Sequence, residues 1–122
     1  MKDMNMILLY VDNPPASAKF YANLLDKQAL DVSPNFAVFM LDSGVKFGLW
    51  SKHDVEPGAT SVGGSELGFS VSERGLVDAH YEAWGRMGLE IAQERTEMDF
   101  GYTFTALDPD GHRLRVFALN PQ

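Results

Sequence analysis

Residues 100–119 read FGYTFTAL-DPDG-HRLRVFAL, and this stretch predicts a β-hairpin. Pro109 at the second position of DPDG and Gly111 at its last position are typical of a tight turn. The flanking residues alternate in character, as expected of strands over 100–107 and 112–119. A strand–turn–strand unit is therefore expected at the end of the chain.

The same pattern occurs earlier in the chain, with Asp42-Ser43-Gly44 as the turn. Short glycine-containing turns of this kind join antiparallel strands, here expected over 36–42 and 45–51. Before each hairpin, the periodicity indicates one strand, one helix and one short strand. These elements are expected over 5–11, 14–26 and 28–32 in the first half, and over 65–72, 74–87 and 89–94 in the second half.

The order strand, helix, strand, strand, strand thus occurs twice, which predicts an α+β fold built from two βαβββ repeats. The first repeat spans about 4–52 and the second about 64–120. Residues 52–64 carry proline and glycine without periodicity, which is typical of a linker. Each repeat is too small to bury both faces of its own sheet. A length of 122 residues is typical of one domain, so we expect 1–122 to form a single domain.

The chain has 122 residues, no cysteine and a formal net charge of −7. The lack of thiols excludes disulfide scaffolds, zinc ribbons and cysteine nucleophiles. The negative charge repels phosphate backbones, so no nucleic-acid partner is expected. No apolar run approaches the roughly 20 residues that span a bilayer, and no signal peptide is recognisable, so we expect a cytoplasmic protein without a membrane partner.

Alternation assigns the strand residues to two faces of each sheet. One face is almost uniformly apolar and is expected to pack under the helices. Its residues are Ile7, Leu9, Val11, Val45, Phe47, Leu49, Leu67, Phe69, Val71, His112, Leu114 and Val116. The other face mixes aromatic residues, glycines and charges. Its residues are Met6, Leu8, Tyr10, Lys46, Gly48, Trp50, Glu66, Gly68, Ser70, Arg113, Arg115 and Phe117, and counting back from the turn aspartates adds Phe39, Thr103 and Thr105.

This mixed face has the composition of a cavity wall. Glycine in mid-strand leaves room for a ligand to approach the backbone, and aromatic side chains line most ligand sites. A second interpretation stays open, in which two such sheets pack directly on each other and Glu66 forms an ion pair with Arg115.

Two segments resemble the vicinal oxygen chelate superfamily, also called the glyoxalase / bleomycin resistance / dioxygenase superfamily. They are Leu8-Leu9-Tyr10-Val11-Asp12, which leads into a helix with Phe20-Tyr21, and Leu107-Asp108-Pro109-Asp110-Gly111-His112, which leads into the last strand. The resemblance implies two βαβββ units whose curved mixed sheets surround a cleft. It also implies a homodimer with sites shared between the chains.

Within the superfamily, Phe47-Gly48-Leu49-Trp50-Ser51 and the segment from Tyr102 to Val116 are most similar to phenazine antibiotic resistance proteins, which bind griseoluteate-type antibiotics. In that subgroup an aromatic side chain stacks on the flat ligand. The resemblance gives this role to Trp50.

Metal-dependent relatives place their ligands at equivalent points of the two repeats, which correspond here to Met6, Gly48, Glu66 and Arg115. Only Glu66 suits a hard or borderline divalent cation, because a thioether prefers soft metals, glycine has no side chain and arginine repels a cation. A catalytic site needs about three protein ligands. We therefore expect no metal and no cofactor, which argues against lactoylglutathione lyase and dioxygenase chemistry.

No catalytic residue is predicted. Arg115 would bind a ligand carboxylate through its planar guanidinium, and the hydroxyls of Thr103 and Thr105 would donate hydrogen bonds. The alternatives are pairing of Arg115 with Glu66 and ordinary strand propensity of the threonines. The expected ligand-binding residues are Trp50, Phe39, Gly48, Glu66, Thr103, Thr105, Arg115, Phe117, Met6 and Leu8.

Three functions remain open at this point. The first is a metal-independent binding protein that sequesters a planar aromatic antibiotic or toxin, phenazine- or bleomycin-like, and so confers resistance. The second is a lyase, isomerase or dioxygenase of the superfamily, with a non-standard metal site or with Glu66 as general base. The third is a partner-binding module whose cleft is filled by its own side chains.

Overall fold

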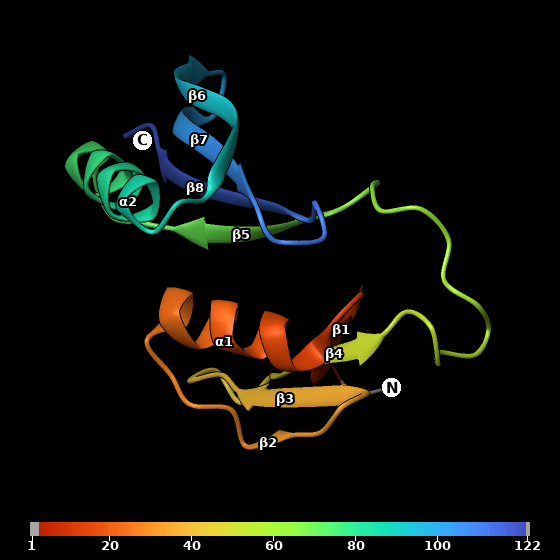
Figure 1. Ribbon diagram of the computed structural model, residues 1–122. Coiled ribbons are helices and arrows are strands. Elements are labelled where there is room, and N and C mark those ends of the chain that lie inside the picture. The colour runs from red at the N-terminus through yellow and green to blue at the C-terminus, as the bar shows by residue number, and fades with distance from the viewer. Residues whose placement is uncertain (1–2, 122) are drawn as a thin grey trace. The chain divides into compact units, whose positions relative to one another are not determined.

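The computed structural model describes residues 3–121 and divides the chain into two compact units, Met1–Ser61 and Val62–Gln122 (Figure 1). Each unit contains one helix and one four-stranded sheet, with strand orders β1-β4-β3-β2 and β5-β8-β7-β6. The predicted fold class, α+β with two βαβββ units, is confirmed. Within residues 3–121, neither helix has the length and apolar character needed to cross a membrane.

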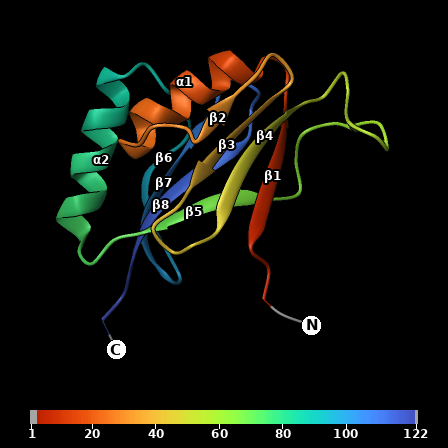
Figure 2. The ribbon, with the colours of Figure 1, turned by 90° about the horizontal axis from the view of Figure 1, so that it is seen from below.

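In the N-terminal unit, β1 (Met6–Val11) runs parallel to β4 (Lys46–Ser51), and β4 is antiparallel to β3 (Phe36–Met40). The edge beyond β3 is the two-residue strand β2 (Asp31–Val32). Figure 2 shows these strands side by side in the order β2, β3, β4, β1. A parallel pair requires a crossover connection, and the helix α1 (Pro14–Leu25) provides it.

The start of α1 follows from its first residues. The side chain of Asn13 accepts a hydrogen bond from the backbone N–H of Ala16 at 3.0 Å, and proline occupies the first helical positions. The helix packs on β3 and β4. Its fully buried Tyr21 meets the ring of Phe47 edge to face, with the centroids 4.8 Å apart. Helix α1 therefore covers one face of its sheet.

The C-terminal unit repeats this arrangement. Strand β5 (Glu66–Ser70) is parallel to β8 (Arg113–Leu119), and β7 (Gly101–Leu107) is antiparallel to both β8 and β6 (Glu90–Met98). The crossover helix is α2 (Arg74–Arg86). Strand β6 is longer than predicted and contains two register shifts.

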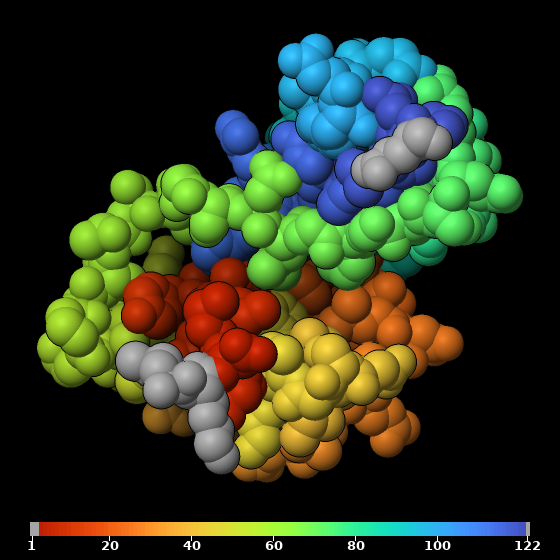
Figure 3. Space-filling model, turned by 180° about the vertical axis from the view of Figure 1, so that it is seen from behind, coloured from red at the N-terminus to blue at the C-terminus, as the bar shows by residue number. Residues whose placement is uncertain are grey.

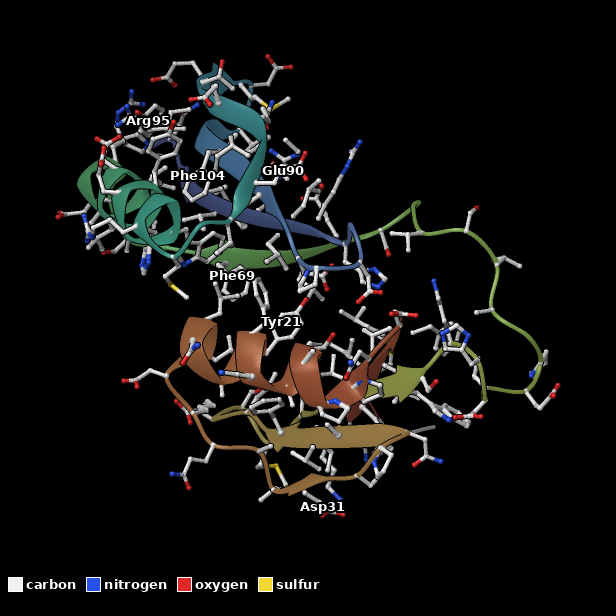
Figure 4. The ribbon with its side chains drawn as sticks, viewed as in Figure 1. Tyr21, Asp31, Phe69, Glu90, Arg95 and Phe104 are labelled. Atoms are coloured by element: carbon white, nitrogen blue, oxygen red, sulfur yellow. The ribbon has the colours of Figure 1, made fainter. Side chains whose placement is uncertain are left out.

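Helix α2 is held on its sheet by aromatic packing. Trp84 is 5% exposed, and its ring lies 5.5 Å from the rings of Phe69 and Phe104 in edge-to-face contacts. Figure 4 labels Phe69 and Phe104. Such pairs add about 0.5–1.5 kcal/mol beyond the burial of area. Trp84 is thus a core residue of this unit.

The two hairpin turns correspond in a different register from the one that their aspartates suggest. In the first turn the N–H of Leu41 donates to the carbonyl of Val45 at 2.9 Å. In the second, the N–H of Asp108 donates to the carbonyl of His112, also at 2.9 Å. Leu41, and not Asp42, is therefore the structural counterpart of Asp108.

This register corrects one predicted site residue. Counting back from Asp42 shifts the first hairpin by one residue, and a shift of one residue moves a side chain to the other face of a strand. The placement of Phe39 on the mixed face is therefore wrong. Phe39 is fully buried on the helix side of the sheet, with its ring centroid 6.2 Å from that of Phe47. The counterparts of Thr103 and Thr105 are Phe36 and Val38.

Candidate ligand-binding site

Each sheet has one face under its helix and a second face, which we call the open face. In the N-terminal unit the open face is mostly apolar. Its rows across the strands are Tyr10–Trp50–Phe36, Leu8–Gly48–Val38 and Met6–Lys46–Met40. The side chains of Met6, Leu8, Tyr10 and Met40 are each about 40% exposed. Figure 3 shows β1, in red, at the molecular surface.

Trp50 lies at the centre of an aromatic row on this open face. Its ring centroid is 6.5 Å from that of Tyr10 and 6.4 Å from that of Phe36, at interplanar angles of 79° and 84°. Trp50 is half-buried. Aromatic rings contact flat conjugated molecules by offset stacking or edge-to-face packing. The row can therefore make either kind of contact.

Gly48, expected to leave space on this face, is covered by its neighbours. A Cβ atom there would lie 2.6 Å from Leu8 Cδ2, 3.1 Å from Phe36 Cζ and 3.2 Å from Met6 Cε. The space above the glycine is thus filled by two flexible side chains and one ring. Since Met6 and Leu8 are partly exposed and unbranched at Cβ, they can change rotamer when another molecule approaches.

The open face of the C-terminal unit is polar and is organised by Arg115. Its Nε donates to Glu66 Oε2 at 2.5 Å, and its Nη2 donates to Glu66 Oε1 at 3.3 Å. Its Nη1 donates to Gln93 Oε1 at 2.8 Å and to Thr103 Oγ1 at 3.3 Å. The side chains of Arg115 and Glu66 are 17% and 35% exposed. The structure therefore brings together three of the predicted site residues in a bidentate ion pair with polar support.

The two threonines lie beneath this network. Thr103 and Thr105 are 0% and 2% exposed, in register with Phe117 and Arg115. The Thr103 hydroxyl donates to the carbonyl of Val116 at 2.8 Å, and that of Thr105 donates to Gln93 Oε1 at 3.2 Å. Both hydroxyls therefore have protein acceptors already and support Arg115 and Gln93 from below.

Phe117 lies in the next row of the same face. Its ring is 6.1 Å from that of Phe100 in an edge-to-face contact, and both side chains are partly exposed. The C-terminal open face thus carries one aromatic pair beside the polar network.

Sequence reasoning missed Gln93, and the reason is a pair of β-bulges. Ile91 pairs with Ala106 on the helix side, yet Gln93 pairs with Thr105 on the open face. The extra residue, Ala92, changes which face the following side chains occupy. Simple alternation along β6 cannot anticipate such an insertion, so no signal in the sequence identified Gln93.

Two hollows lie on the polar open face. The smaller has a volume of about 270 Å³ and is lined by Ala92, Gln93, Thr105, Arg113 and Arg115. The larger has a volume of about 590 Å³, within the range of roughly 300–1,000 Å³ that is usual for ligand sites. Its lining runs along residues 62–66 and includes Ala92, Leu107, Gly111 and Arg113. Arg113 and Ala92 line both hollows.

The residues at the family's metal positions do not fit a metal. Met6 offers a thioether, Gly48 offers no side chain, and both oxygens of Glu66 are bound by Arg115. Within residues 3–121, no three His, Asp or Glu side chains are placed to hold a metal ion. A hard divalent cation needs several oxygen or nitrogen donors, and this set supplies one, already paired with a cation.

A separate group of charges lies between α2 and its sheet. The hydroxyl of Tyr102 donates to Asp78 Oδ1 at 2.7 Å, and Arg95 Nη1 donates to the same oxygen at 3.0 Å. These donors hold the pKa of Asp78 below its usual value, the Tyr102 hydrogen bond being the larger cause. Arg95 also lies 4.2 Å above the ring of Tyr81. This cluster attaches the helix and is not part of the open face.

Comparison with known proteins gives three kinds of likeness. The family model of the Glyoxalase/Bleomycin resistance protein/Dioxygenase superfamily matches residues 3–116. The phenazine antibiotic resistance protein EhpR of Enterobacter agglomerans is 32% identical over 120 residues, which cover 95% of this chain and 92% of EhpR. The solution NMR structure of protein ATC0852 from Agrobacterium tumefaciens is 48% identical, with a TM-score of 0.91 and coverage of 99% of this chain and 100% of that one.

A more distant likeness concerns the fold alone. A glyoxalase-related enzyme from Fulvimarina pelagi has a TM-score of 0.83 at 18% identity, covering 97% of this chain and 88% of that one. The family match over most of the chain, the relation to EhpR and the paired βαβββ units agree. The chain belongs to the glyoxalase/bleomycin resistance protein/dioxygenase superfamily.

Proposed function

We propose that this protein binds a planar aromatic small molecule, phenazine- or bleomycin-like, and sequesters it without metal or chemical conversion. The observation that carries the proposal is the row of Tyr10, Trp50 and Phe36 on a partly exposed apolar face. A flat conjugated ligand would bury area against this row and gain from aromatic contacts. The relation to a phenazine resistance protein points to the same class of ligand.

The arrangement of Glu66 supports binding over catalysis by a general base. A base must accept a proton from the substrate, and it must be within hydrogen-bond reach of that proton. Both carboxylate oxygens of Glu66 already accept hydrogen bonds from Arg115. We therefore assign Glu66 to the support of Arg115. The guanidinium of Arg115 and the neighbouring Gln93 provide the polar donors on the open face of the C-terminal unit.

We also propose that the functional form is a homodimer whose sites are shared between chains, as in the subgroup that the sequence resembles. The partly exposed apolar side chains of β1 would gain from burial against a second copy. Light scattering on the purified chain tests this part. A mass of one chain at working concentration would overturn it without touching the ligand proposal.

The binding proposal is tested by calorimetric titration with phenazine-1-carboxylate as probe, followed by mass spectrometry of the recovered probe. We expect saturable binding and an unchanged probe. In Trp50→Ala, loss of ring contacts should weaken binding by roughly tenfold. A matched control is Leu30→Ala, an equally simple truncation at a residue that is 61% exposed outside this row. Equal affinity in Trp50→Ala, or a chemically altered probe, would overturn the proposal.

A further inference from the structure

Two arginines share the polar open face, and they differ in what they bind. Arg113 and Arg115 are two residues apart on β8 and point to the same side of the sheet. Arg115 is 17% exposed and is held by Glu66, Gln93 and Thr103. Arg113 is exposed, and among the described residues no carboxylate lies within ion-pair distance of it.

The pairing of Glu66 explains why Arg113 is left uncommitted. In the strand register Glu66 lies directly opposite Arg113, and Arg115 lies opposite Gly68. The carboxylate nevertheless turns toward Arg115, where it makes two hydrogen bonds. A bidentate arginine–carboxylate pair satisfies both oxygens of the acid at once. One guanidinium is thus neutralised and the other keeps its positive charge and its donors.

The guanidinium of Arg113, which has no ion-pair partner among the described residues, lies at two hollows of the surface. Arg113 borders both hollows of the open face, of about 270 and 590 Å³. The smaller hollow adds the amide of Gln93. Among the residues that the structure describes, its Nε2 donates only to the weak acceptor Met98 Sδ, at 3.5 Å. A guanidinium presents parallel N–H donors that match the two oxygens of a carboxylate, and an amide N–H can add a third bond.

We propose that Arg113, with Gln93, forms an anion site that takes the carboxylate of an organic acid. The inference goes beyond the proposed function: it concerns the C-terminal unit alone and does not require one ligand to contact both this site and the aromatic row. It assigns the carboxylate to Arg113, whereas the sequence predicts Arg115 for that role.

Two acidic residues near Arg113, Glu66 and Glu90, could weaken the binding of an anion there. Glu66 is 35% exposed but faces Arg115. Glu90, which is labelled in Figure 4, pairs with Leu107, and Leu107 pairs with Arg113. The register therefore places Glu90 two strands from Arg113 on the same side of the sheet. Glu90 lines neither hollow. At physiological salt, exposed charges separated by about 8 Å or more are largely screened, so Glu90 weakens the site only slightly.

The test uses the full ¹⁵N-labelled chain and follows arginine Nε–H and glutamine Nε2–H signals by NMR at constant ionic strength. The probes are benzoate, its neutral isostere benzamide, and inorganic phosphate. We expect benzoate to shift the signals of Arg113 and Gln93, benzamide to leave them unchanged, and phosphate to bind more weakly than benzoate. In Arg113→Gln the benzoate affinity should fall by about fivefold, the value of an exposed ion pair.

The control is Arg86→Gln, which removes an arginine from the last turn of α2, away from both hollows. It should leave benzoate binding unchanged. Equal shifts with benzoate and benzamide, stronger binding of phosphate than of benzoate, or unchanged benzoate affinity in Arg113→Gln would each overturn the inference. The wild-type comparison of benzoate with benzamide requires no variant to fold.

A second arm separates this inference from the proposed function. Phenazine-1-carboxamide, which carries no carboxylate, is titrated into the wild-type chain, with benzoate in a parallel sample. Binding of the carboxamide without any benzoate shift at Arg113 would refute the anion site and leave aromatic sequestration standing. Failure of the carboxamide to bind, with benzoate still shifting Arg113, would refute sequestration and leave the anion site standing.

Discussion

Replacing Arg115 by methionine removes the centre of the polar open face. The change deletes two hydrogen bonds to Glu66, one to Gln93 and one to Thr103. Methionine keeps most of the side-chain length but offers no donor. The effect on the free energy of unfolding therefore reports what the guanidinium contributes to the fold.

The size of the loss follows from what the remaining groups do. Thr103 keeps its bond to the Val116 carbonyl, and Gln93 keeps the hydroxyl of Thr105 as a donor. Glu66, at 35% exposure, regains water only in part and keeps a charge without its partner. Apart from that charge no polar atom is stranded, so the cost lies near that of one or two hydrogen bonds to a charged group, about 1.5–3 kcal/mol. For a chain of this length, the melting temperature should fall by roughly 5–15 °C.

The decisive comparison adds Glu66→Met to Arg115→Met. Apolar replacement of a whole ion pair is often neutral, whereas removal of one partner is costly. The position equivalent to Glu66 in the N-terminal unit is already a methionine, Met6, which shows that this strand position accepts the side chain. We expect the double variant to recover at least half of the loss.

Urea unfolding followed by circular dichroism measures all three proteins under the same conditions. A loss below about 0.5 kcal/mol in Arg115→Met would refute the reasoning, because it would place the pair among ordinary exposed ion pairs. A double variant less stable than Arg115→Met would refute the claim that the uncompensated Glu66 causes the loss.

Two further outcomes follow from local geometry. Gly101→Ala should lower stability by about 2–5 kcal/mol, because φ is +153° and a Cβ would lie 2.0 Å from the carbonyl oxygen of Ala118; thermal unfolding measures it. Asp78→Asn should reduce the loss in the free energy of unfolding that occurs as the pH falls into the acidic range. The pKa of Asp78 is lowered mainly by Tyr102, so its contribution is full above the ordinary value of 3.8 and is lost as pH falls through the folded-state pKa.

Each of these has its own control. Gly68→Ala lies in the same sheet, where a Cβ would meet only Phe117 at 3.4 Å, and it should be nearly neutral. A similar loss in both glycine variants would contradict the backbone clash. For Asp78→Asn, urea midpoints at pH 7 and pH 3 should differ less than in the wild type, and an unchanged difference would count against the role of Asp78.

The order of elements and the family could be predicted from the sequence because both depend on short-range patterns. Hydrophobic periodicity marks the helices, and the DPDG turn marks the last hairpin. Alternation also predicts which face of the sheet a side chain occupies when the count starts inside the strand itself. Gly48 and Arg115, for example, occupy equivalent positions in the two sheets, as predicted. These signals require no knowledge of three-dimensional contacts.

The incorrect or missing face assignments arise where residue alternation is counted from a turn or across a bulge. Phe39 was placed on the wrong face because Asp42 and Asp108 do not occupy the same turn position. Gln93 was not found because a bulge at Ala92 changes the parity of β6. A single inserted residue is invisible in an alternating pattern, and only the hydrogen-bond register reveals it.

The sequence predicts the partners of Arg115 only in part. It leaves pairing with Glu66 open as an alternative to ligand binding, and the structure shows the bidentate pair. The consequence for Arg113 could not be derived, because which arginine the carboxylate chooses depends on side-chain rotamers.

The most direct test of the central claim uses the two tryptophans of the chain. Each gives one indole N–H signal, and Trp84 is a buried internal control in the aromatic packing under α2. Titration with phenazine-1-carboxylate should shift the Trp50 signal through the ring current of the probe, leave that of Trp84 in place, and return the probe with its mass unchanged. A shift at Trp84 alone, no shift at either residue, or a converted probe would contradict the account.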